Sequence, residues 1–350
     1  MRAKPKAVEE PRAAAYHTTI RPRPRRVRTM NASPDLLADL HSYRQLRLSA
    51  DPLRLDDAGP IFVPGVRPEA LGDGPFRRDH GVRLAYLAGS MANGIGSVEI
   101  VEAMARAGML GFFGAAGLSI GRIASAIDRL QASCGDLPHG FNLIHSPAEP
   151  RHETEVVELY LARGVRLVEA SAYLDLTLPV VRFRTAGIHV GADGRVVAPN
   201  RIIAKVSRVE VATRFFSPPP EKMLAELLGA GHLSEEQARL ARRIPVAQDV
   251  TAEADSGGHT DNRPAITLIP TLIALRDRLQ AEYRYESPLR VGAAGGIATP
   301  ASCAAAFLMG GGLCDDRLDQ PGVPRVGVVG PRPRDARPGR AGRCHHGPRR

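Results

Sequence analysis

Short apolar runs alternate with amphipathic stretches along most of this chain. The runs occupy residues 82–88, 110–114, 140–145, 165–170, 202–207, 244–250 and 289–296. Between them apolar residues recur at helical spacing, as after Ser119, where Ile120, Ile123 and Ile127 fall on one face. The pattern predicts helices over 97–107, 151–163, 177–186, 265–283 and 299–309, and one that begins at 119. Continuous apolar strands joined by helices are typical of a parallel sheet covered on both faces.

The number of repeats indicates the fold class. Seven strand–helix units favour an α/β protein of the TIM (β/α)8-barrel type over an open Rossmann-like sheet, although the alternation alone leaves both open. We place this domain at 81–312, after an N-terminal segment at 31–80. That segment contains a predicted helix at 34–48 and a short strand at 61–65.

Two insertions interrupt the alternation. Residues 188–200 predict a β-hairpin that turns at Asp193-Gly194. Residues 217–243 predict an inserted helical subdomain of two short helices, the second capped by Ser234. Placed on the face where barrel loops build an active site, this subdomain would be a lid; a passive excursion is the alternative.

The pattern stops after Met309-Gly310. Residues 313–350 form an Arg/Pro/Gly-rich tail with nine Arg and no Lys. GC-rich DNA read out of frame gives such a composition, so we hypothesise a frameshift near codons 310–313; a divergent tail is the alternative. The chain as written is therefore predicted to lack its eighth strand–helix unit, which would leave the first and seventh strands as open edges.

Charge and cysteine content limit the classes of partner. Of the net charge of +10, residues 1–30 carry +7 and residues 313–350 carry +5, which leaves −2 for the body of the chain. We expect a disordered basic tail at 1–30 and no nucleic-acid partner. The four cysteines are scattered without C-x-x-C spacing, which argues against a disulfide framework or a metal site. We find no signal peptide and no run of 18 apolar residues, so we expect a cytoplasmic protein without a membrane partner.

One glycine-rich turn predicts phosphate binding. Gly295, Gly296 and Ile297 follow the seventh strand, and Thr299-Pro300 then opens a helix. Glycine lets the backbone approach a phosphate closely, and the free N–H groups of the helix start supply the counter-charge. A plain tight turn is the alternative.

Polar residues that follow other strands are predicted to lie at the same end of the barrel as this turn, which we call its mouth. Gly89, Ser90 and Met91 follow the first strand, in a loop that can lie along a flat ring and bond to its edge. Further candidates are Asn142 after the third strand, Lys205 on the fifth and Gln248 on the sixth. A lysine can stabilise negative charge on a reduced flavin. Lys205 pairing with a carboxylate is the alternative.

A histidine follows the sixth strand. His259 comes after Gly257 and Gly258, in a loop that leaves it free to meet a ligand. Its ring exchanges protons near neutral pH, which suits it to acid–base catalysis. A solvated, idle loop histidine is the alternative.

Several stretches together resemble a known family. They are LAYLAGSMANGIGSVEIVEAMARAGMLGFFGAAGLS at 84–119, GFNLIHSP at 140–147, VEASAYLDLT at 168–177, AKVSRVEVA at 204–212, TAEADSGGHTDNRPA at 251–265 and VGAAGGIATPAS at 291–302. Over about 80–312 the chain resembles the nitronate monooxygenase and enoyl-reductase superfamily of flavoproteins, and most closely its PfaD branch.

The resemblance implies FMN bound without a covalent link at the barrel mouth and reduced by NAD(P)H. It implies reduction of the 2,3-double bond of acyl chains on an acyl carrier protein, in polyunsaturated fatty acid or polyketide biosynthesis. His259 matches the family's histidine, the candidate for donating the proton or polarising the thioester carbonyl. The wider superfamily has Glu-Ala where this chain has Asp255-Ser256, which puts nitronate chemistry in doubt. A nitronate monooxygenase and an inactive remnant are the alternatives.

Overall fold

The computed structural model describes residues 67–255, 261–297 and 299–316. The predicted basic tail at 1–30, the helix at 34–48, the strand at 61–65 and the tail beyond 316 lie outside these residues.

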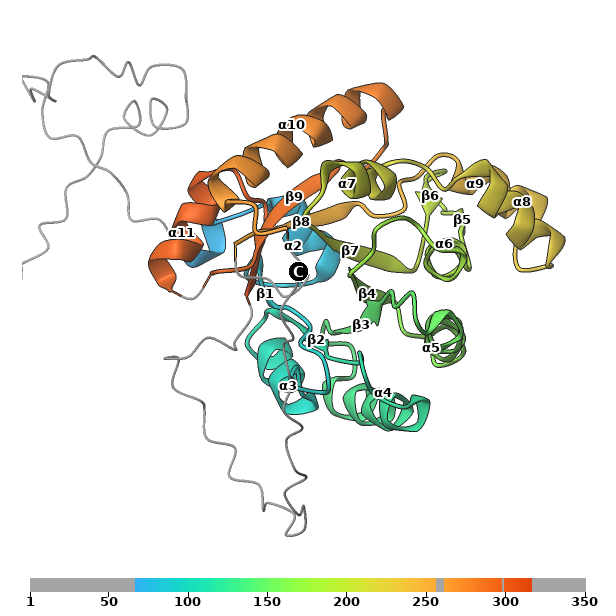
Figure 1. Cartoon of the computed structure of the whole chain (residues 1–350), viewed down its shortest axis with the longest axis horizontal. Coiled ribbons are helices and arrows are strands. Elements are labelled where there is room, and N and C mark those ends of the chain that lie inside the picture. The colour runs from blue at the N-terminus through green and yellow to red at the C-terminus, as the bar shows by residue number, and fades with distance from the viewer. Residues whose placement is uncertain (1–66, 256–260, 298, 317–350) are drawn as a thin grey trace, which may run out of the picture. The chain divides into compact units, whose positions relative to one another are not determined.

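Eight parallel strands form a closed barrel (Figure 1). In chain order they are β1 Tyr86–Ala88, β2 Leu110–Phe113, β3 Gly140–Ile144, β4 Leu167–Ser171, β7 Arg201–Val206, β8 Asp249–Glu253, β9 Arg290–Ala294 and β10 Cys314–Asp316. The hydrogen-bonded order is β1-β10-β9-β8-β7-β4-β3-β2, closed through the β1–β2 pair. The predicted TIM-type barrel is confirmed, and the open Rossmann-like alternative is excluded.

Amphipathic helices surround the strands (Figure 1). They are α3 Val98–Arg106, α4 Ile120–Cys134, α5 Pro150–Ala162, α6 Leu178–Thr185, α7 Val209–Phe216, α10 Ala265–Tyr283 and α11 Pro300–Leu308. The predicted apolar face of α4 packs inward, because Ile123, Ile127 and Leu130 are completely buried. No helix in the described residues is long and apolar enough to cross a membrane.

The prediction that the eighth strand is missing was wrong. β10 pairs in parallel with β1 through Tyr86–Cys314 and with β9 through Cys314–Ala293. Three residues suffice to complete the ladder, and Leu313 and Cys314 are fully buried, so neither β1 nor β9 is left as an edge. The residues after Asp316, where a helix would complete this eighth unit, lie outside the described residues.

A short helix closes the amino-terminal end of the barrel. Helix α2, Gly74–His80, follows the 3-10 turn η1 at Pro68–Ala70 and places Phe76 against the barrel floor. That floor is an apolar cluster of Phe76, Val82, Ala85, Leu87, Leu110, Phe112, Leu167, Ile203 and Leu313. Asp249 and Arg290, at the starts of β8 and β9, attach the helix: His80 Nε2 lies 2.9 Å from Asp249 Oδ2, and Arg290 lies 5.6 Å over the Phe76 ring.

Both insertions lie at this same end. The hairpin is confirmed as β5 His189–Val190 and β6 Val196–Val197, with a turn at Gly194. It precedes β7, whereas the inserted helices α8 Glu221–Gly229 and α9 Glu235–Ala241 precede β8, beside α6 in Figure 1. Ser234 caps α9 as predicted and accepts from the Gln237 amide.

The expectation of a lid was therefore wrong. Helix α7 runs back from the mouth before the insertion begins, and the chain returns beside the end of α7. There the Ala247 and Val246 amides donate to the Phe215 and Ser217 carbonyls. An insertion between a helix and the next strand emerges on the amino-terminal face, opposite to the loops that build barrel active sites.

Candidate active site

A layer of buried polar side chains lies above the apolar floor. Its members are Ser90, Asn142, Glu169, Lys205, Thr251 and Asp315. Lys205 of β7 reaches Asp315 of β10, and Ser90 after β1 reaches Glu169 of β4, although neither pair of strands is adjacent. Such contacts have to cross the barrel, so this layer fills its interior near the carboxyl ends of the strands.

Glu169 is the centre of the layer. Its Oε2 accepts from Lys205 Nζ at 2.8 Å, from the Ser90 amide at 2.8 Å and from the Ser90 hydroxyl. Asn142 Nδ2 donates to the Glu169 carbonyl at 3.2 Å. Burial opposes ionisation of the Glu169 carboxyl, but the Lys205 charge and these donors hold its pKa below the usual value. Glu169 and Lys205 therefore form a buried ion pair.

Asp315 adds a second carboxyl to this layer. It is 1% exposed, and within the described ranges neither of its oxygens has an N–H or O–H donor, although Lys205 Nζ lies 3.8 Å from Oδ2. In the same ranges Glu169 Oε1 also lacks a donor. Burial, and then the charge of Glu169, raise the pKa of Asp315 well above its ordinary value. A protonated Asp315 would supply the donor that Glu169 Oε1 lacks.

The backbone of the predicted phosphate turn has a shape that would let a phosphate approach it closely. Gly295 and Gly296 at the end of β9 have φ of 81° and 69°. A Cβ at Gly295 would overlap the Ala254 carbonyl oxygen, whereas Gly296 is exposed. Helix α11 begins directly afterwards, capped by a reciprocal pair of bonds between Thr299 and Ser302. Successive glycines with positive φ before a helix start form a concave set of N–H groups that suits an anion.

A cavity of about 420 Å³ opens beside the polar layer. It is lined by residues that follow β3, β4, β7 and β8, namely Ile144, His145, Ser146, Pro147, Ala172, Tyr173, Leu174, Lys205, Val206, Ser207, Arg208, Val211, Glu253 and Asp261. Leu174 is 64% exposed and gives this cavity an apolar wall. Its volume lies in the range of small-molecule sites.

The structure brings most of the predicted residues to this mouth. Gly89, Ser90, Asn142 and Lys205 meet in or beside the polar layer, and Met91 is buried in the loop after β1. The donors of Ser90 point inward to Glu169, and Lys205 makes the carboxylate pair that was the alternative to a flavin contact. Gly295, Gly296 and Ile297 stand at the end of β9.

Gln248 is the exception. It precedes β8 at the closed end of the barrel, and its side chain donates to the Pro288 carbonyl. The prediction took the apolar run at 244–250 for the strand, but Val246 and Ala247 are buried beside α7 and the strand begins at Asp249. Gln248 therefore has no place in a site at the mouth.

The predicted histidine lies outside the described residues, together with Gly257 and Gly258. The ends of its segment are described. The Asp255 amide donates to the Arg263 carbonyl. Asp261 forms a two-bond ion pair with Arg208, and these two residues line the mouth cavity. Asp255 also accepts from the Ala265 amide at the start of α10. Asp255, at which the chain departs from the wider superfamily pattern, thus connects the two described ends of this segment.

Sequence reasoning missed Glu169, Asp315 and His145. Glu169 and Asp315 sit within predicted strand or tail, and only the closed barrel brings them together. His145 is the last residue of a predicted strand, and that position at the carboxyl end was the signal that could have identified it.

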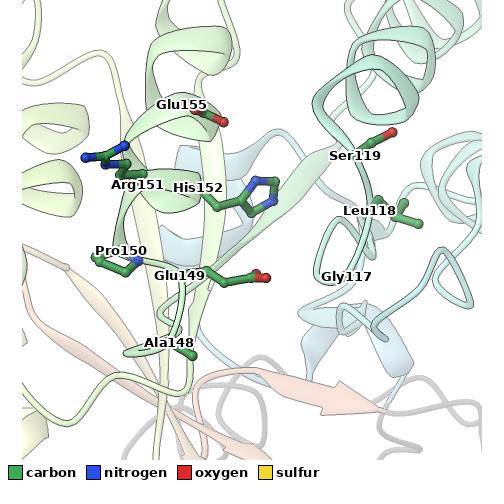
Figure 2. Close-up of a pocket in the computed structure, with 9 residues that line it drawn as sticks. All are labelled: Gly117, Leu118, Ser119, Ala148, Glu149, Pro150, Arg151, His152 and Glu155. Carbon is green, nitrogen blue, oxygen red and sulfur yellow. The ribbon is translucent and has the colours of Figure 1, made fainter.

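A larger cavity, of about 680 Å³, lies between the starts of α4 and α5 (Figure 2). Figure 2 shows the side chains of Glu149 and His152 extending into this gap, across from Ser119. Its charged residues Arg151 and Glu155 are exposed, and it contains none of the predicted site residues. We assign no function to it.

The mouth fits the flavin that the resemblance implies. The Gly295-Gly296 turn, with positive φ at both glycines, has a backbone shape that would suit a phosphate. The polar layer offers two buried atoms that have no hydrogen-bond partner in the part of the chain that the structure describes, Thr251 Oγ1 and Glu169 Oε1. Lys205 lines the adjacent cavity. The glycine turn would hold the phosphate, and Thr251, Glu169 and Lys205 would face the ring.

Comparison with known proteins identifies relatives in polyketide and polyunsaturated fatty acid biosynthesis. Polyketide biosynthesis protein PksE of Bacillus subtilis is 45% identical over 247 residues, 70% of this chain and 32% of that protein. One polyunsaturated fatty acid synthase subunit of a Thraustochytrium species is 48% identical over 242 residues, 69% of this chain and 16% of that protein. The chain thus spans less than a third of the length of these relatives. No protein-family model matches it.

A solved structure shows the same fold. The crystal structure of the enoyl reductase domain of MlnA, from the macrolactin cluster of Bacillus amyloliquefaciens, matches with a TM-score of 0.68 and 40% identity, over 71% of this chain and 56% of that one. The resemblance seen in the sequence is therefore confirmed. The chain belongs to the enoyl reductase family of the polyketide and polyunsaturated fatty acid synthases.

Proposed function

We propose that this protein is an FMN-dependent enoyl reductase that acts in trans on 2,3-enoyl thioesters carried by an acyl carrier protein. The observation that carries the proposal is the glycine turn at Gly295-Gly296, which faces the same barrel mouth as the Lys205 cavity in a fold shared with an enoyl reductase domain. NAD(P)H is the proposed reductant. The acyl carrier protein is the proposed partner, because the relatives are synthase proteins.

The residues at the mouth have separate tasks in this proposal. When bound, FMN supplies the hydride that NAD(P)H renews. The N–H groups of Gly295, Gly296 and Ile297 hold its phosphate, with Gly89, Met91 and Asn142 beside the ring. Lys205, which forms a buried ion pair with Glu169, would place a cation next to the ring. His259 is the proposed proton donor, and Gly257 and Gly258 are proposed to bind the cofactor; all three lie outside the described residues.

The cavity at the mouth is the proposed binding site for the acyl substrate. Its apolar wall at Leu174 suits an acyl chain, and the polar groups at its inner end suit a thioester carbonyl. Reduction adds a hydride to the β-carbon and a proton to the α-carbon, and the product remains attached to its carrier.

The test begins with the visible absorption spectrum of the purified chain, recorded with and without added FMN after desalting. Retained flavin absorbance, followed by NAD(P)H consumption that depends on crotonyl-pantetheine, supports the proposal. Oxygen uptake with an alkyl nitronate in place of that turnover would show the nitronate monooxygenase instead. A protein that stays colourless would overturn the flavin enzyme altogether.

A further inference from the structure

A buried carboxylate holds a histidine at the wall of the mouth cavity. His145 follows β3, and its Nδ1 lies 2.8 Å from Glu153 Oε2 on α5. The Glu153 side chain is 3% exposed, whereas that of His145 is 21% exposed. Because His145 lines the cavity, its exposed part faces the space assigned above to the substrate.

The carboxylate is itself fixed by two hydroxyl donors. Tyr173 Oη donates to Glu153 Oε1 at 2.8 Å, and Thr177 Oγ1 donates to the same oxygen. Burial, and then the charge of Glu153, raise the pKa of Tyr173 well above its usual value, so this phenol keeps its proton. The Tyr173 ring also stacks on the His145 ring, with centroids 5.5 Å apart. These contacts restrict the tilt and rotation of the imidazole.

This arrangement leaves one ring nitrogen available. Nδ1 is engaged by Glu153, and no side chain or backbone group in the described residues bonds to Nε2. When Nδ1 donates to Glu153, Nε2 carries an N–H only in the doubly protonated ring. His145 lines the cavity together with Lys205 and Leu174.

We propose that His145 is a substrate-binding residue that donates a hydrogen bond from Nε2 to the thioester carbonyl, and that Glu153 is the positioning residue behind it. The inference rests on the proposed function and deepens it. As hydride reaches the β-carbon, the π electrons move toward the carbonyl oxygen, and the proton added at the α-carbon then completes the saturated thioester. A donor fixed at that oxygen stabilises the charge that develops there.

Binding of an unreactive product separates this contact from turnover. Wild-type protein, loaded with FMN, is titrated by calorimetry with butyryl-pantetheine and with its S-butyl thioether analogue, which lacks only the carbonyl oxygen. We expect tighter binding of the thioester, by about tenfold. H145A should abolish this preference, and H145Q, whose amide can donate, should keep part of it. E153Q should reduce the preference, because the ring is no longer held.

Controls separate loss of the contact from loss of the fold. H189Q changes a histidine on the exposed hairpin at the opposite end of the barrel and should bind as wild type does. Flavin absorbance and the melting temperature of H145A should stay near the wild-type values. In turnover of crotonyl-pantetheine, H145A should lose about 10²-fold in kcat/KM.

The possible failures are distinguishable. If wild-type protein turns over the enoyl thioester and H145A keeps both the carbonyl preference and kcat/KM, the role of His145 is overturned and the proposed function stands. If wild-type protein retains flavin but neither binds nor reduces the thioester, both are overturned.

Discussion

Two buried carboxyls show how much a single side chain depends on its neighbours. Glu169 and Asp315 lie in the same polar layer, but Glu169 accepts from Lys205 and Ser90, whereas Asp315 has no N–H or O–H donor among the described residues. The pKa of Glu169 is therefore lowered and that of Asp315 raised, although both side chains are buried. Sequence alone predicted Lys205 as a mouth residue and left its carboxylate partner as an alternative without naming it.

Asp315 should make the protein less stable as the pH rises. The pKa of Asp315 is raised in the folded state. Its favourable contribution to the free energy of unfolding is therefore complete below the ordinary carboxyl pKa of about 4, and it is lost as the pH rises toward the folded-state pKa. D315N cannot ionise, so its free energy of unfolding at pH 8 should exceed the wild-type value by about 1–3 kcal/mol. Urea denaturation at pH 5 and pH 8 measures this. Equal pH dependence in both proteins would contradict the assignment.

Gly295 should be indispensable for the phosphate turn. Its φ of 81° disfavours any L side chain, and an added Cβ would overlap the Ala254 carbonyl oxygen. G295A should therefore weaken FMN binding by tenfold or more, measured by quenching of flavin fluorescence. G229A is the matched control, because Gly229 ends α8 at the other end of the barrel and a Cβ there meets nothing within 4 Å. Equal losses in the two variants would mean that this turn does not hold the cofactor.

At the scale of elements, periodicity predicted which segments form helices and strands but not where every strand begins. The run at 244–250 is apolar because Val246 and Ala247 are buried beside α7, so its pattern resembles a strand that starts five residues late. The same shift misplaced Gln248. Chain order would have placed both insertions correctly, since each follows a helix and precedes a strand. The short β10 was missed because Asp315 and Asp316 break the apolar pattern.

Helix α2 should depend on Asp249 for its attachment. At the closed amino-terminal end of the barrel, Asp249 accepts hydrogen bonds from His80 at 2.9 Å and from Arg290 at 2.5 Å and 3.1 Å. D249N leaves Arg290 with a neutral partner in a buried site and should cost about 3–5 kcal/mol of unfolding free energy. D79N is the control, because the Asp79 side chain, also bonded to Arg290, is 41% exposed and should cost less than about 1 kcal/mol. Thermal or urea unfolding compares the two, and equal costs would refute a special role for the buried pair.

The frameshift remains a proposal that the genetic code makes testable. Read from the second base of each codon, Cys314, Asp315 and Asp316 become Ala or Val, Thr or Met, and Thr or Ile. The next two codons, for Arg317 and Leu318, permit Gly-Ser. We predict that the coding DNA encodes an uncharged strand and a Gly/Ser/Thr turn in this frame, after which the barrel pattern continues. A charged strand or a stop codon there would contradict the proposal, and sequencing the gene and its transcript decides it.

For the whole molecule, function follows from a barrel with two unlike ends. The amino-terminal end is filled by Phe76 and its apolar cluster and carries both insertions, whereas the carboxyl end holds the polar layer, the glycine turn and the cavity. Sequence reasoning predicted the barrel and the glycine turn, because both depend on local pattern. It could not predict contacts across the interior, which exist only once the barrel closes.

The most direct test of this account is an anaerobic experiment on the flavin itself. Purified protein loaded with FMN is reduced by one equivalent of NADPH or NADH, and crotonyl-pantetheine is then added while the flavin absorbance is followed. We predict bleaching by the nicotinamide, followed by recovery of the oxidised spectrum in step with formation of butyryl-pantetheine. A flavin that bleaches but is reoxidised only when air is admitted would contradict the assignment as an enoyl reductase.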